Sequence, residues 1–150
     1  MLARRPFGSE ALLQRAARDE WFALGEQDWL EAFSHHPRIG DRASLDARFP
    51  ATHDLSQQEQ AGVAAAREEV LDALARGNAA YLDRFGFIFI VSAAGKSAAE
   101  LLQLLRDRLS NDRATELRIA AEEQAKITAL RLTTSFRAYK PAVRPGIPDR

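Results

Sequence analysis

Cysteine is absent from the 150 residues of this chain, and neither sign of charge is in excess. Without thiols the chain forms no disulfide, no thiolate metal site and no cysteine nucleophile. A chain without cysteine also suits a reducing compartment. The chain has 21 lysines and arginines against 21 aspartates and glutamates, so the formal net charge is zero. No overall basic field therefore draws this protein to nucleic acid.

Long apolar runs are missing as well. No stretch of the sequence approaches the ~20 residues that a membrane helix needs. The first seven residues, Met1 to Phe7, lack the apolar core and cleavage site of a signal peptide, and the chain end carries no targeting tripeptide. We therefore expect a cytoplasmic protein of one domain, without a membrane partner.

Helical signals fill most of the sequence. Ser56-Gln57-Gln58-Glu59 has the capping-box pattern and predicts a long helix from about residue 57 to 84. Gly77 weakens the middle of this helix and allows close packing there. Ser97 to Glu100 forms a second capping box, and a last long helix is expected over residues 113–136. Its predicted inward face carries Leu117, Ala120, Ala121, Ile127 and Leu130.

The stretch Phe85-Gly86-Phe87-Ile88-Phe89-Ile90-Val91 is aromatic, β-branched and short, which is typical of a strand. No other run resembles it, so we expect an extended segment wedged among helices. Its backbone N–H and C=O groups then need other partners, either a bound polar ligand or side chains and water. The predicted fold is all-α: a single-domain helical bundle over residues 1–138, with one strand-like segment near 85–93. Residues 139–150 are expected to form an irregular tail.

Ser34-His35-His36-Pro37-Arg38-Ile39-Gly40-Asp41 gathers two of the three histidines on one corner. Pro37 keeps His36 out of a helix interior, so the preceding helix should end near Ser34. The imidazole of His36 is then presented where it can exchange a proton near neutral pH. A polar loop with solvated histidines is the alternative. The following residues, 40–53, are expected to be irregular.

Other kinds of chemistry find little support. His35, His36 and His53 with Asp41 and Asp54 match no metal-binding spacing, so no metal is predicted. The chain contains neither a G-x-S-x-G elbow nor a glycine-rich phosphate loop. Acid–base chemistry without a cofactor remains.

The candidates for that chemistry are His36, Glu59, Gln60 and Arg131. Glu59 and Gln60 lie in the first helical turn, whose free N–H groups favour an anion, and Arg131 suits a carboxylate. Each has an ordinary alternative: Glu59 completes a capping box, Gln60 is solvated, and Arg131 stabilises a helix end.

Several motifs together resemble the 2-oxo-4-hydroxy-4-carboxy-5-ureidoimidazoline (OHCU) decarboxylase family of uric acid degradation. The most specific are His36-Pro37-Arg38-Ile39-Gly40 and Phe85-Gly86-Phe87-x-Phe89 at this separation. The others are Arg5-Pro6-Phe7, Asp28-Trp29, Ser56-x-x-Glu59-Gln60-Ala61-Gly62, Asn78-x-x-Tyr81, Arg108-Leu109-x-Asn111, Glu116 and Ile127-x-x-Leu130-Arg131-Leu132. Family members usually have another helix before Arg5, and its absence here is expected to affect packing or dimerisation.

The resemblance implies a helical homodimer without a cofactor that converts OHCU to (S)-allantoin. It implies His36 as the proton-handling residue and Glu59 as its catalytic partner. The implied substrate-binding residues are Pro37, Ser56, Gln57, Gln58, Gln60, Phe89, Ile90, Val91, Ser92, Ala93 and Arg131. Two alternatives stay open: another cofactor-free lyase or isomerase acting on a small heterocycle, and a helical dimerisation or binding module without catalysis.

Overall fold

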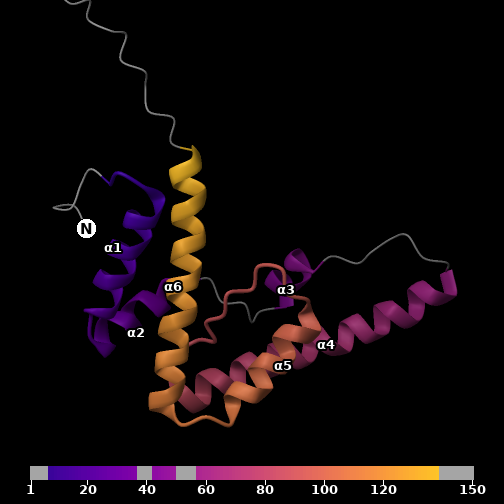
Figure 1. Cartoon of the computed structure of the whole chain (residues 1–150). Helices are drawn as coiled ribbons and strands as arrows, with labels where there is room; N and C mark the ends of the chain where they lie inside the picture. Colours follow the sequence, from indigo (N-terminus) through magenta and orange to yellow (C-terminus); the bar gives the residue numbers. More distant parts are fainter. Residues whose placement is uncertain (1–6, 37–41, 50–56, 139–150) are drawn as a thin grey trace, which may run out of the picture. The chain divides into compact units, whose positions relative to one another are not determined.

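The computed structural model describes residues 7–36, 42–49 and 57–138; for Arg42 and residues 57–63 it describes the backbone alone. The described part contains helices and no strand, which confirms the all-α fold class (Figure 1). The helices are α1 (Glu10–Phe22), α2 (Glu26–Ser34), α3 (Arg42–Arg48), α4 (Gln57–Phe85), α5 (Ala98–Leu109) and α6 (Arg113–Ala138). Residues 139–150, the predicted tail, lie outside the described part, so the domain boundary at 138 stays a prediction.

The chain divides into two compact units, each described here by itself. The smaller unit contains α1 and the part of α6 from Ala125 onward. Ser9 caps α1, since its side chain accepts a hydrogen bond from the Leu12 N–H. The Thr133 hydroxyl joins α6 to α1, because it lies 2.7 Å from both Gln14 Nε2 and Glu10 Oε1.

The predicted inward face of α6 is correct at Leu117, Ala120 and Ala121, which are buried, and wrong at Leu130, which is 51% exposed. Periodicity places these residues on one face of the helix. It does not say how far along that face the neighbouring helices extend, which is why the error falls near the end of α6.

The larger unit, from Leu24 to Gln124, is built on the packing of α5 against α4 (Figure 1). The capping box of α5 forms as predicted: the Ser97 side chain accepts from the Glu100 N–H, and the Glu100 carboxylate accepts from the Ser97 N–H. Both helices carry buried leucines, among them Leu74 of α4 and Leu105 of α5.

Gly77 of α4 lies directly against Leu105 of α5, and we expect Gly77→Ala to lower the free energy of unfolding. An added Cβ would lie 2.5 Å from Leu105 Cδ2, and Leu105 is completely buried. Alanine gains about 1 kcal/mol of helix propensity, but overpacking costs about 1–3 kcal/mol. The expected net decrease in the free energy of unfolding, measured by urea denaturation, is about 1 kcal/mol.

The reference background for this prediction is Leu105→Ala, which vacates the space that the new methyl group needs. In that background Gly77→Ala should raise the free energy of unfolding, since only the propensity gain is left. An equal loss of stability in both backgrounds would contradict the packing explanation.

Residues 42–48 form a helix, α3, where the sequence predicted irregular chain. Seven residues are too few for a helix that is stable alone, so local propensity gave no warning. Tertiary contacts explain it: Leu45 is completely buried, and Arg67 of α4 donates to the Phe49 carbonyl and to Asp46, each at 2.8 Å.

Gly86 follows the last residue of α4; it adopts a positive φ of 77° and donates its N–H to the Leu82 carbonyl. Glycine reaches this conformation without the strain that a Cβ would cause. Residues 88–93 are then neither helix nor strand, yet residues 89–93 are buried. The prediction of a buried non-helical segment among helices is therefore confirmed, and we call residues 87–93 the buried segment.

Candidate active site

The histidine corner begins where α2 ends, at Ser34, as the sequence predicted. The His36 N–H donates to the Phe33 carbonyl, which continues the last turn by one residue. His35 is exposed, whereas His36 is half-buried and its Nε2 atom is fully covered. The two neighbouring imidazoles therefore have different surroundings, and only His36 faces the protein interior. Residues 37–41 lie outside the described part.

An aromatic contact connects this corner to the buried segment. The rings of Phe33 and Phe87 lie 5.7 Å apart between centroids, and both side chains are buried. Tyr81 of α4 stacks edge-on against Phe87 and Phe89, at 5.8 and 5.3 Å. Because Phe33 precedes His36 by one helical turn, this packing holds the turn that carries His36 against the start of the buried segment.

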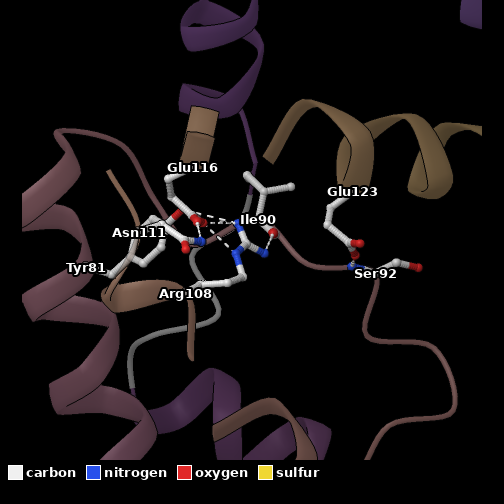
Figure 2. A network of polar contacts seen from close by, with 7 residues as sticks. All are labelled: Tyr81, Ile90, Ser92, Arg108, Asn111, Glu116 and Glu123. Atoms are coloured by element: carbon white, nitrogen blue, oxygen red, sulfur yellow. Dashed lines mark hydrogen bonds and ion pairs between the residues drawn. The ribbon is translucent and has the colours of Figure 1, made fainter. Parts of the chain in front are cut away.

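A buried ion pair lies beneath the same segment (Figure 2). Arg108 of α5 and Glu116 of α6 are 7% and 0% exposed, and Arg108 Nε donates to Glu116 Oε1 at 2.5 Å. Asn111 donates to the second carboxylate oxygen at 2.9 Å. Arg108 Nη1 donates to the Ile90 carbonyl at 2.7 Å, so the ion pair also satisfies a backbone group of the buried segment.

Tyr81 completes this network from α4. Its hydroxyl donates to Glu116 Oε1 and accepts from Arg108 Nη2. Burial raises the pKa of Tyr81 far above its ordinary range, and the bond to Glu116 acts in the same direction. The phenol therefore stays protonated and serves as a fixed donor.

Ser92 is held at both of its backbone groups. Its N–H donates to Glu123 Oε2 of α6 at 2.6 Å, and its carbonyl accepts from Lys96 Nζ at 2.7 Å. Side chains thus satisfy the Ile90 carbonyl and both backbone groups of Ser92, which is one of the alternatives that the sequence left open. No residue of the described ranges is hydrogen-bonded to the backbone of Val91, which lies between them and is 4% exposed.

The remaining predicted site residues are described only in part. Pro37 and Ser56 lie outside the described residues, and Gln57, Gln58, Glu59 and Gln60 are described as backbone in the first turn of α4. Arg131 is an exposed residue of α6 and belongs to the smaller unit, whereas His36 belongs to the larger. Their mutual geometry stays a prediction.

Sequence reasoning noticed Arg108 and Glu116 only as part of the resemblance and did not notice Glu123. A signal for the first two was present. Arg108 follows Leu101 by seven residues on the buried stripe of α5, and Glu116 precedes Ala120 by four on α6. A positive residue on the apolar face of one helix and a negative residue on the apolar face of another indicate a buried ion pair.

Among residues 7–36, 42–49 and 57–138, no group of three or more His, Cys, Asp or Glu side chains is arranged to hold a metal ion. No helix in those ranges is long and apolar enough to cross a membrane.

Several known proteins are similar to this chain over most of its length. The uric acid degradation bifunctional protein TTL of Arabidopsis thaliana is 45% identical over 123 residues, which cover 80% of this chain and 37% of that protein. The chain thus spans well under half the length of that relative. The 2-oxo-4-hydroxy-4-carboxy-5-ureidoimidazoline decarboxylase of Halalkalicoccus jeotgali is 32% identical over 135 residues, 87% of this chain and 71% of that protein.

A solved structure shares the fold. It is a crystal structure of OHCU decarboxylase in the presence of (S)-allantoin, with a TM-score of 0.70 and 38% identity, and the match covers 90% of this chain and 87% of that one. The family model for OHCU decarboxylase matches residues 1–133. The chain therefore belongs to the OHCU decarboxylase family.

Proposed function

We propose that this protein decarboxylates OHCU to (S)-allantoin without a cofactor. Relatives that carry the name of this decarboxylase, and a similar fold solved in the presence of (S)-allantoin, support the proposal. The observation in this chain that carries it is the Phe33–Phe87 contact. It brings a half-buried histidine next to a buried segment in which the Val91 backbone has no hydrogen-bond partner among the described residues.

The substrate chemistry needs no metal or pyridoxal group. One ring carbon of OHCU bears a hydroxyl and a carboxylate, and the neighbouring ring carbon is doubly bonded to nitrogen. That C=N group accepts the electron pair when CO2 leaves, as the ketone of a β-keto acid does. The protein has to hold the carboxylate out of the ring plane while CO2 leaves and a C=C bond forms between the two ring carbons. The hydroxyl then loses its proton and becomes a carbonyl, and a proton is delivered to one face of the ureido-bearing carbon, the former C=N carbon.

His36 is the group proposed to handle the proton, through the substrate hydroxyl or carboxylate. Glu59 is proposed to orient His36 or the ureido group. The half-buried position of His36 supports this role, because an imidazole screened from water holds a defined orientation toward a ligand. Pro37 is proposed to bind the substrate beside it.

The amide groups of the substrate need hydrogen-bonding partners, and the buried segment supplies candidates. Side chains bond to residues 90 and 92, which alternate along the segment. In an extended chain, neighbouring residues direct their polar groups to opposite sides. We therefore assign the N–H and C=O of Val91 to the ligand side, together with the backbone of Phe89 and the N–H of Ala93, whose carbonyl accepts the Lys96 N–H.

Substrate binding is completed by polar side chains in this proposal. Ser56, Gln57, Gln58 and Gln60 bind the ureido and ring amides from the start of α4. The free N–H groups of the first turn of a helix favour an anionic ligand there. Arg131 positions an anionic or carbonyl oxygen, since a guanidinium forms two parallel hydrogen bonds with a carboxylate.

The test is CO2 release. OHCU is generated in situ from urate with urate oxidase and the hydrolase that acts on its product, and CO2 is measured with and without this protein. The proposal predicts release well above the spontaneous rate. Consumption of OHCU without CO2 would indicate an isomerase, and no acceleration at all would favour a binding module.

We further propose a homodimer in the cytoplasm. The resemblance to the family supports the dimer, and the absence of cysteine suits a reducing compartment. Light scattering should give twice the 16.7 kDa chain mass.

A further inference from the structure

We propose that Glu123 and Arg108 are positioning residues, which clamp the buried segment on both sides of Val91 and so orient the Val91 backbone toward the substrate. This inference rests on the proposed function. Neither side chain is assigned a contact with the substrate. They act through Ile90 and Ser92, the two residues that flank Val91 (Figure 2).

One half of the clamp is rigid. Arg108 reaches the Ile90 carbonyl with Nη1 at 2.7 Å, while its Nε is bound to Glu116. Its guanidinium also lies 4.6 Å from the centre of the Phe89 ring. A planar guanidinium bound at several edges cannot rotate without breaking these contacts together, so the Ile90 carbonyl has a fixed direction.

The other half is a carboxylate from a different helix. Glu123 of α6 accepts the Ser92 N–H at 2.6 Å, and a charged acceptor gives a stronger hydrogen bond than a neutral one. Lys96 bonds to the carbonyl of the same residue. The segment has no strand partner in the described part of the chain, so these side chains replace the ladder that would otherwise fix its backbone.

The competing explanation is that Arg108 and Glu123 only stabilise the fold. Substitution of the right residue distinguishes this explanation from a positioning role. Removing Arg108 would leave Glu116 as an unpaired buried charge, and such a variant is expected to fold poorly. Glu123 is half-buried and lies outside that ion pair, so its substitution leaves the Arg108–Glu116 contact intact. The test therefore uses Glu123.

Glu123→Ala should raise KM for OHCU about tenfold and leave kcat within about twofold. The amides that Val91 is proposed to bind do not react, so their hydrogen bonds stabilise the ground state and the transition state alike. The affinity for (S)-allantoin, measured by calorimetry, should fall by a similar factor. Hydrogen exchange of the Ser92 amide should become faster.

Two further variants serve as controls. Glu123→Gln keeps an oxygen that accepts the Ser92 N–H, so KM and the Ser92 exchange rate should stay within about threefold of the wild-type values. Gly77→Ala strains the contact between α4 and α5 but leaves the Glu123 carboxylate on the Ser92 N–H, so KM and the Ser92 exchange rate should change much less than in Glu123→Ala. A KM increase in this variant equal to that of Glu123→Ala would show a general effect of lost stability and would overturn the inference.

The inference and the proposed function fail in different ways. Wild-type turnover together with unchanged KM, allantoin affinity and Ser92 exchange in Glu123→Ala would overturn the clamp and leave the decarboxylase proposal standing. A folded wild-type protein with neither turnover nor affinity for (S)-allantoin would overturn the proposed function, and the clamp with it.

Discussion

His36→Asn is expected to lower kcat for OHCU by about 10²–10⁴-fold, the range that general acid–base assistance contributes. Asparagine has a similar size and keeps a polar group, but it cannot exchange a proton near neutral pH. The Phe33–Phe87 contact does not involve the imidazole, so the fold should be retained. Steady-state kinetics with substrate generated in situ measures the effect.

The neighbouring histidine provides a matched control for this experiment. His35 caps the end of α2 and is exposed, so His35→Asn makes the same chemical change one residue away. Its turnover should stay close to that of the wild type, and both variants should unfold at similar denaturant concentrations. Near-wild-type kcat in His36→Asn would remove His36 from the proton-handling role.

Glu116→Ala is expected to cost about 3–5 kcal/mol of unfolding free energy, because it leaves the Arg108 guanidinium buried and uncompensated. Glu116 is completely buried, and its carboxylate also accepts hydrogen bonds from Tyr81 and Asn111. All three donors lose their acceptor together. Such a loss is a large fraction of the stability of a typical domain, so the variant should unfold at a much lower urea concentration.

An exposed ion pair in the same unit is the reference for Glu116. Arg113 and Glu26 lie 2.7 Å apart, and their side chains are 49% and 50% exposed. Glu26→Ala should cost less than about 1 kcal/mol, because water solvates the remaining charge. Similar losses in the two variants would contradict the view that burial makes Glu116 important.

Local signals in the sequence were sufficient for most helices. The first capping box and the apolar stripe predicted a helix over 57–84, and α4 spans Gln57–Phe85. The second box forms at Ser97. These predictions succeeded because capping and periodicity depend on residues within one or two turns. The strand-like run near Phe89 was recognised from its composition and its lack of a partner.

Features that depend on distant residues were missed. The short helix α3 is stabilised by Leu45 burial and by Arg67 from α4, neither of which its own seven residues reveal. The clamp residue Glu123 approaches Ser92 only because α6 folds against the buried segment. Leu130 was predicted inward from periodicity alone and is exposed.

For the candidate site, the sequence predicts the chemical type of the residues, and that prediction stays to be tested. A histidine before proline at the end of a helix indicated a presented proton-handling group, and the structure places α2 accordingly. His36, Glu59 and Arg131 were grouped as acid–base candidates from their chemistry and position, the resemblance supported that grouping, and their proximity in space stays a prediction. Spatial convergence of residues so far apart in sequence depends on tertiary packing, which periodicity does not encode.

The stereochemistry of the product tests the central claim most directly. Circular dichroism of allantoin is followed while OHCU is produced from urate, with the wild-type protein, with His36→Asn and without protein. We predict a rapid rise of the (S)-enantiomer with the wild type alone, since a protein-bound group delivers the proton to one face. Racemic allantoin at the spontaneous rate in all three samples would contradict the assignment of this chain as an OHCU decarboxylase.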